Sequence, residues 1–196
     1  MSKNDHTREW IAAGYLELAD ETPLRKITVQ KLCSHVRINR STFYYHFSSI
    51  LDLIQWIYHK EVNEPVQQAI VDNLDFQTEI SKNVLTSIYK RRGFWQRALR
   101  LPTEQELIDF MLRDTMENWK LLIQAILQFK GIRPEDLTAQ QVQELKYIQE
   151  YYCYAHHHIS ITWMRDGMVF PPEMLAKIID NIALNGFTYA VDKAVE

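Results

Sequence analysis

Apolar residues recur three or four positions apart along most of the chain, the spacing that places side chains on one face of an α-helix. The first stripe lies between Thr7 and Asp20 and should end at Pro23. Further stripes occupy 27–47, 50–65, 80–92, 94–101, 103–131, 138–167 and 171–190. No segment alternates between apolar and polar residues over enough positions to indicate a β-strand. The pattern therefore predicts an all-α protein of about nine helices.

Capping and helix-breaking residues predict several boundaries between these helices. The serine pair at 48–49 can cap the helix that follows it. Pro65 should bend or break that helix, because proline lacks the N–H that a helix interior needs. The basic run at 90–92, followed by a glycine, is expected to end another helix. Thr103 and Glu106 have the spacing of a capping box, so a long helix should begin there.

The stretch from Ile27 to Phe47 has the pattern of two short helices joined by a tight turn. Thr28 can cap the first helix, and Asn39 can cap a second one that begins at Arg40. On the second helix Phe43 and Phe47 are four residues apart and should both point inward. The opposite face is expected to carry Arg40, Ser41, Thr42, Tyr44, Tyr45 and His46. Such a division is typical of a helix that reads the major groove of DNA.

The charge distribution supports DNA contact by this part of the chain alone. Residues 1–60 contain eight Lys or Arg against six Asp or Glu, whereas residues 61–196 contain fourteen against nineteen. Between Thr22 and Leu51 there is no acidic residue, while five basic residues are present: Arg25, Lys26, Lys31, Arg37 and Arg40. A basic window in an otherwise acidic chain suits contact with phosphates. The alternative is an ordinary solvated helical hairpin.

The segments 27–29 and 38–47, followed by Leu53, resemble the N-terminal helix-turn-helix of the TetR family of transcriptional regulators. The resemblance covers roughly Thr7 to Tyr58. It implies a DNA-binding domain over residues 1–49, followed by a larger helical bundle over 50–196 that binds an effector and dimerises. The implied partner is a double-stranded DNA operator, bound by a regulator that acts as a repressor.

The resemblance also indicates which residues contact the operator. Positions that match Arg40, Ser41, Thr42 and Tyr44 contact bases or phosphates in the family. Together with the exposed aromatic and basic residues nearby, the expected DNA interface consists of Lys26, Thr28, Arg37, Arg40, Ser41, Thr42, Tyr44, Tyr45 and His46.

Three positions depart from the family pattern. Arg37 stands where a turn glycine is usual, and an arginine adopts a positive φ only at a cost in free energy. Ser48 and Ile50 stand where lysines are common, so a usual phosphate anchor is missing. These departures leave a second hypothesis open, in which the protein is a co-regulator or adaptor that works by protein contact with weak DNA binding or none.

The last two long helices resemble the pair through which this family forms homodimers. Both have wide apolar faces, and small residues such as Ala183 and Gly186 permit close approach of helices. The alternative is that both helices only fill the core of the monomer. A looser resemblance, carried by the segments 91–99 and 163–167, connects the C-terminal part to the branch of dihydroxyacetone-kinase regulators.

The C-terminal part also contains many large apolar side chains that could line a pocket for an unknown small-molecule effector, or receive a regulatory protein. The expected pocket residues are Trp95, Phe110, Met111, Trp119, Tyr152, His156 and Trp163. The alternative is that these side chains simply form the core.

Other chemistry finds little support in the sequence. There is no GxSxG, P-loop or GxGxxG motif, so we expect neither an enzyme nor a bound cofactor. His156, His157 and His158 are about 100° apart around a helix and cannot converge on one metal ion. Cys33 and Cys153 should be small buried hydrophobes, with a redox sensor as the alternative. Without a long apolar run or signal peptide, a cytoplasmic protein with no membrane contact is expected.

Overall fold

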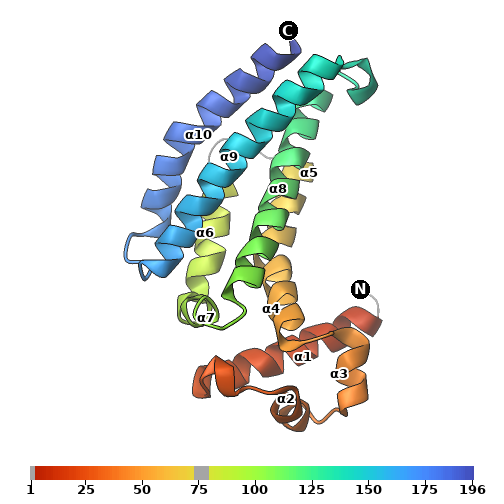
Figure 1. Ribbon diagram of the computed structural model, residues 1–196, viewed down its shortest axis with the longest axis vertical. Helices are drawn as coiled ribbons and strands as arrows, with labels where there is room; N and C mark the ends of the chain where they lie inside the picture. Colours follow the sequence, from red (N-terminus) through yellow and green to blue (C-terminus); the bar gives the residue numbers. More distant parts are fainter. Residues whose placement is uncertain (1–2, 73–79) are drawn as a thin grey trace.

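The computed structural model describes residues 3–72 and 80–196, and in these ranges it contains helices and no strand (Figure 1). The α-helices are α1 (Lys3–Glu21), α2 (Val29–His35), α3 (Arg40–His46), α4 (Ile50–Tyr58), α5 (Glu64–Val71), α6 (Ile80–Lys90), α7 (Arg92–Ala98), α8 (Glu104–Phe129), α9 (Ala139–Arg165) and α10 (Pro172–Val195). Short 3-10 turns lie at Leu24–Lys26 and Pro134–Asp136. A π-helical turn at His59–Asn63 joins α4 to α5. If α4, this turn and α5 are counted as one continuous helix, the described residues form nine helices. The all-α prediction is confirmed.

The three N-terminal helices form a compact unit at one end of the molecule (Figure 1). Helix α1 packs against α2 and α3, and its Ile11 and Tyr15 belong to one buried cluster with Leu32, Phe43 and Phe47. Phe43 and Phe47 are 0% and 1% exposed, so the prediction that both point inward is confirmed.

Helix α4 leaves this unit and enters the larger bundle (Figure 1). Its first turn is capped by Ser49, whose hydroxyl accepts a hydrogen bond from the Asp52 backbone N–H at 3.1 Å. At Pro65 the helical path continues and does not break, because the wider π turn at His59–Asn63 comes immediately before the proline. Pro65 then occupies the first turn of α5, where a missing N–H costs little.

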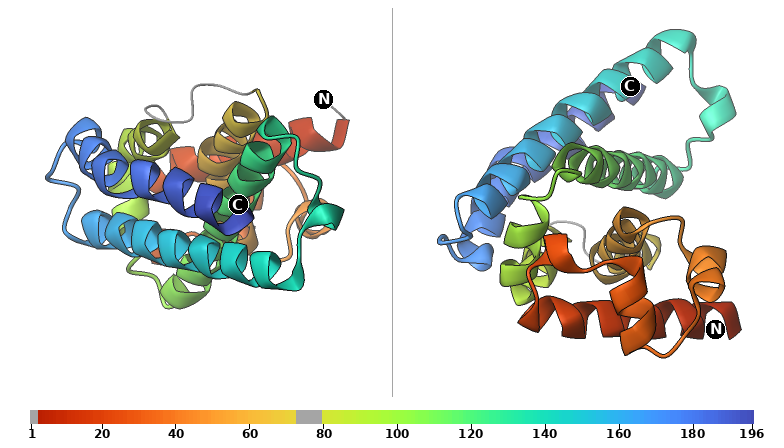
Figure 2. Two further views of the ribbon diagram at one scale, coloured as in Figure 1. Left: turned by 90° about the horizontal axis from the view of Figure 1, so that it is seen from above. Right: turned by 60° about the horizontal axis from the view of Figure 1, so that its bottom comes forward.

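Helices α8, α9 and α10 are the long members of the C-terminal bundle, and α9 and α10 run side by side (Figure 2). One apolar cluster extends from α1–α3 through α4 and α7 into the near ends of α8, α9 and α10. A second cluster fills the far half of the bundle, between α5, α8, α9 and α10. None of the helices in the described ranges combines the length and apolarity needed to span a bilayer.

Helix α6 ends and helix α8 begins where the sequence predicted, but two residues expected to cap these boundaries do not do so. Thr103 precedes α8 but makes no side-chain cap, so the expected capping box with Glu106 is absent there. Gly93 does not end a helix but lies inside α7, because α6 stops at Lys90 and the chain turns at once into the next helix. The capping box of α9 is instead formed by Thr138 with Gln141.

The sequence singled out two small residues of α10, Ala183 and Gly186, as positions where another helix can approach closely. Gly186 accommodates a side chain of the same chain, since a Cβ there would lie 2.6 Å from the Tyr152 hydroxyl oxygen on α9. It therefore permits close packing of α9 and α10 within the monomer. The side chain of Ala183 lies outside the described residues.

Candidate functional site

The turn between α2 and α3 keeps its tight geometry although it lacks a glycine. Arg37 has a φ of 55°, the left-handed conformation that glycine adopts most easily. The Ile38 N–H donates to the Cys33 carbonyl at 3.0 Å, a hydrogen bond typical of a helix that ends in this conformation. The arginine side chain is exposed. Arg37 therefore replaces the usual glycine without changing the conformation of the turn.

Asn39 organises the hydroxyl groups at the start of α3. Its Oδ1 accepts three hydrogen bonds of 2.7 Å, from the Thr42 N–H, the Thr42 hydroxyl and the Ser41 hydroxyl. Because both hydroxyls donate to Asn39, their oxygen lone pairs remain free to accept from the amino groups of bases. Thr28 caps α2 in a similar way, accepting from the Lys31 N–H at 3.2 Å.

The exposed face of α3 also presents two tyrosines and one arginine. Tyr44 and Tyr45 are 49% and 78% exposed. Arg40 Nη2 donates to the Tyr44 hydroxyl at 3.5 Å, and its guanidinium carbon lies 5.8 Å from the centre of the Tyr44 ring. Arg40, Ser41, Tyr44 and Tyr45 therefore form one exposed polar face, with Thr42 half-buried at its border.

His46 does not belong to that face. Its side chain is only 8% exposed, so the expectation that it points outward with its neighbours is wrong. Burial, with a smaller contribution from the Arg8 guanidinium, lowers the pKa of His46. Arg8 Nη2 also donates to the His46 carbonyl at 3.2 Å, and the guanidinium lies over the Phe47 ring. Arg8 thus fixes the end of α3 to α1. Because Arg8 lies one turn before Ile11, it is on the same face of α1 as the buried stripe, which was the available signal in the sequence.

Gly14 in α1 is a second positioning residue that the sequence did not single out. A Cβ at this position would lie 2.1 Å from Val36 Cγ1, so a larger residue cannot occupy it without moving α1 away from the end of α2. A glycine in the middle of an otherwise regular helical stripe was the available signal.

The two positions that lack lysines have other structural roles. The Ser48 N–H and hydroxyl both donate to Asp52 Oδ2, at 2.7 and 3.0 Å. Ile50 is partly buried against the core that joins α4 to the N-terminal helices. The start of α4 is therefore stabilised by an acidic cap and apolar packing.

A cavity of ≈ 60 Å³ lies where the two apolar clusters of the bundle meet. Its described wall comes from the end of α4, the π turn, α5, α6, α8 and α9. The polar members of that wall are Asn63, Ser81, Thr115, Asn118 and His156. The apolar and aromatic members are Tyr58, Val62, Val66, Ile70, Ile80, Val84, Trp119 and Leu122.

Only two of the seven predicted pocket residues line this cavity, namely Trp119 and His156. Trp95 is completely buried and packs edge-on against Tyr58, while Met111 is 1% exposed in the same cluster. Phe110 and Tyr152 pack against the two apolar clusters, and Trp163 borders a separate, more open groove between α9 and α10. Helical periodicity identified buried aromatic residues but could not distinguish a cavity wall from a filled core.

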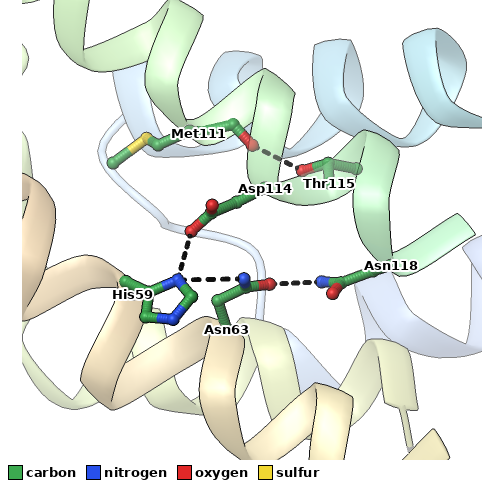
Figure 3. A network of polar contacts seen from close by, with 6 residues as sticks. All are labelled: His59, Asn63, Met111, Asp114, Thr115 and Asn118. Carbon is green, nitrogen blue, oxygen red and sulfur yellow. Dashed lines mark hydrogen bonds and ion pairs between the residues drawn. The ribbon is translucent and has the colours of Figure 1, made fainter. Parts of the chain in front are cut away.

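A chain of polar side chains connects the cavity wall to the path from α4 to α5 (Figure 3). Asn118 Nδ2 donates to Asn63 Oδ1 at 2.5 Å, and Asn63 Nδ2 lies 3.2 Å from His59 Nδ1. The same His59 nitrogen lies 3.1 Å from Asp114 Oδ2. Burial, opposed by His59, raises the pKa of Asp114. The spacing of these residues was the available signal in the sequence. His59 and Asn63 are four residues apart, as are Asp114 and Asn118, so each pair lies on one face of its helix.

The three adjacent histidines have separate surroundings, as helical geometry requires. His156 borders the cavity, His157 is buried, and His158 is exposed. Burial, assisted by His157, lowers the pKa of His156 to about 4, so this ring is neutral at pH 7. Across residues 3–72 and 80–196 there is no group of three or more side chains arranged to hold a metal ion.

Comparison with known proteins identifies the family. A TetR-family model, described as the C-terminal region of a transcriptional regulator, matches residues 77–185, more than half of the chain. The chain belongs to the TetR family of transcriptional regulators. As a member, it is a regulator with an effector-binding C-terminal domain, in a family whose members are generally not enzymes. No curated protein matches the sequence.

Two solved structures of regulators have the same fold as this TetR-family chain. The first is the dihydroxyacetone kinase operon activator DhaS, with a TM-score of 0.66 and 20% identity over 93% of this chain and 97% of that one. The second is the fatty acid degradation regulator FadR from Bacillus halodurans, with a TM-score of 0.57 and 13% identity over 95% of this chain and 97% of that one.

Proposed function

We propose that this protein is a repressor that binds a DNA operator sequence-specifically as a homodimer in the cytoplasm. In this proposal residues 1–49 bind DNA, and residues 50–196 dimerise and receive a small-molecule effector or a regulatory protein. The main supporting observation is the geometry of the helix-turn-helix, in which Arg37 keeps the tight turn and Asn39 orders the hydroxyls of Ser41 and Thr42.

Each residue of the interface has a role suited to its chemistry. Arg40 can read a guanine edge or contact a phosphate, and Ser41 and Thr42 can accept hydrogen bonds from bases. Tyr44 and Tyr45 offer exposed hydroxyls to the DNA backbone. The exposed residues Lys26, Thr28 and Arg37 can contact phosphates beside α3. His46 acts by positioning the helix, since its carbonyl is held by Arg8.

Exposed apolar stripes on the last two helices support dimerisation through α9 and α10. Tyr147, Tyr151 and Tyr154 on α9 are 62%, 71% and 53% exposed. On α10 the stripe continues at every fourth residue, with Met174, Ile178 and Ile182 exposed by 54%, 44% and 70%. Exposed apolar surface at helical spacing is characteristic of a contact with another protein. A two-fold dimer through these faces would present two copies of α3 to half-sites about 34–36 Å apart.

The cavity offers a route for control of DNA binding. Its wall includes the π turn that follows α4, and α4 packs in the same apolar cluster as α1–α3. An effector that binds one arrangement of these helices more tightly than another would change the population of DNA-competent dimers. The change is limited by its differential affinity for the two arrangements.

A second candidate function, the adaptor that works through protein contact, is favoured by the start of α4. There Ser48 is paired with Asp52, and Ile50 packs into the core, so neither offers a cation to phosphate. The two functions differ in their dependence on salt, because only phosphate contacts release bound counterions.

Binding to a mixed-sequence duplex, measured by fluorescence anisotropy, separates these candidates. For about four neutralised phosphates we expect the affinity to fall ~100-fold between roughly 50 and 200 mM salt. An affinity that is weak and independent of salt would reject the DNA-binding proposal in favour of the adaptor.

A further inference from the structure

The cavity has no formal charge in its described wall. Its polar side chains are amides, hydroxyls and one imidazole, and none of the lining residues in the described ranges is Lys, Arg, Asp or Glu. The imidazole is His156, which burial keeps neutral at pH 7. An anion in such a site would lose its hydration without gaining a counter-charge, which is strongly unfavourable. The wall therefore selects against anions.

Two polar atoms in this wall lack a hydrogen-bond partner among the described protein groups. These atoms are Asn118 Oδ1 and His156 Nε2, and both are buried. Buried polar atoms in folded proteins nearly always have partners, so each such atom requires an explanation. Both belong to planar groups whose final torsion is broad, so a small rotation can turn either atom toward a bound molecule.

The rest of the wall limits the size and shape of an occupant. The cavity volume of ≈ 60 Å³ corresponds to room for about four to six water-sized groups. Trp119 packs edge-on against His156, with ring centroids 6.2 Å apart, so an aromatic surface adjoins one of the two unpartnered atoms. A molecule that fits has a short apolar body and one polar end.

The polar network determines which kind of polar end is suitable. His59 Nδ1 cannot accept a hydrogen from Asn63 and donate its own to Asp114 at the same time. The tautomer of His59 thus sets the direction of the hydrogen bonds along Asn63 and Asn118. When Asn118 donates to Asn63, the Oδ1 of Asn118 is a free acceptor. When the side-chain amides of Asn63 and Asn118 are both flipped, the Nδ2 of Asn118 is a free donor instead. A molecule that both donates and accepts satisfies either arrangement.

We propose that this cavity binds a small neutral molecule whose polar end both donates and accepts hydrogen bonds, such as a primary amide or an alcohol, held by Asn118 and His156. The proposal rests on the proposed role of the C-terminal domain as an effector site and adds the chemical class of the effector. Anions and plain hydrocarbons of the same size are excluded, the former because the wall offers no positive charge and the latter because they leave the two polar atoms without partners.

Three isosteric probes, each with six non-hydrogen atoms, test this inference on the full-length protein: 2-methylpropanamide, 2-methylpropanoate and 2,3-dimethylbutane. The protein has five tryptophans, and labelling with 5-fluorotryptophan gives each a ¹⁹F signal. Trp119→Phe assigns the signal from the cavity wall. We expect the amide to shift the Trp119 signal in a saturable way and the carboxylate at pH 7 to leave it unchanged. The hydrocarbon should bind at least ~10-fold more weakly than the amide.

Variants identify the recognising groups. Asn118→Leu and His156→Phe should each weaken the amide by about tenfold, the effect of one lost hydrogen bond. Gln124→Leu, an exposed position on the same helix α8, is the matched control and should leave binding unchanged. Circular dichroism shows whether each variant is folded. If one of the two cavity variants does not fold, the other still tests the inference.

The inference is overturned if the carboxylate binds as well as the amide, if the hydrocarbon does, or if no probe moves the Trp119 signal. It is also overturned if both cavity variants bind the amide normally. DNA binding of the same sample without any probe is measured in parallel. A protein that binds DNA but none of the probes contradicts this inference alone, whereas one that binds the amide but not DNA contradicts the proposed regulator function.

Discussion

Asn118 on α8 donates a hydrogen bond to Oδ1 of Asn63, which lies in the π turn between α4 and α5 (Figure 3). Both residues border the cavity, so this contact joins the wall of the cavity to the helical path that leads to helices α1–α3. Asn63 is 2% exposed, and an amide buried to this extent depends on its partners.

Asn63→Leu should therefore lower the free energy of unfolding by about 1–3 kcal/mol, because Asn118 and His59 each lose a partner. Chemical denaturation measures the change, with the exposed Gln68→Leu on α5 as control. In the double variant with Asn118→Leu the loss should be smaller than the sum of the single losses. Strict additivity would show that the two amides do not interact.

Thr42→Ala and Tyr44→Phe should each weaken operator binding by about 5- to 100-fold without unfolding the protein, because each removes one polar contact from α3. The loss is measured by fluorescence anisotropy with an operator that has been selected from a random duplex library, and thermal melts verify the fold. Ser34→Ala, on the exposed side of α2, serves as the control. Normal binding by both α3 variants would remove this helix from the interface.

The turn at Arg37 gives a prediction about stability. Because φ is 55°, Arg37→Gly should raise the free energy of unfolding by up to about 1 kcal/mol, while Arg37→Val should lower it by more than that. Thermal or chemical denaturation distinguishes the two directions. If Arg37 also contacts a phosphate, Arg37→Gly should reduce the salt slope of DNA binding by about one. A glycine variant less stable than the valine variant would contradict the left-handed turn.

The buried imidazole of His156 predicts a loss of stability in acid. Its pKa in the folded protein is about 4, below the value near 6.5 of an unfolded chain, so acid protonates the unfolded state first. Stability should be complete above pH ~6.5 and should fall as the pH decreases toward 4, by about 1–2 kcal/mol at pH 5 from this group. His156→Gln should flatten this dependence. His158→Gln, exposed on the same helix, should not.

The sequence was sufficient to predict the helices and the helix-turn-helix, because both depend on local spacing. The four-residue separation of Phe43 and Phe47 placed both in the core, and the Asn39 side chain caps α3 as its residue type suggested. His46 was misplaced because it is buried where α3 meets α1, and Arg8, which donates to its carbonyl, lies 38 positions away. Such a contact has no periodic signal.

The cavity could not be predicted for a related reason. Trp95 and Trp119 both lie on apolar stripes, yet one fills the core and the other borders a cavity, depending on how three or more helices meet. Gly186 had the same ambiguity. Its small size suggested contact between subunits, but the space it leaves is occupied by Tyr152 of the same chain.

Selection of bound sequences from a random duplex library, at low and moderate salt, decides whether paired α3 helices read a specific operator. We predict enrichment of a palindrome whose half-sites are about 10 base pairs apart or a multiple of that distance, and loss of the enrichment in Thr42→Ala. If a folded, dimeric protein enriches no sequence at either salt concentration, the α3 helices do not read an operator.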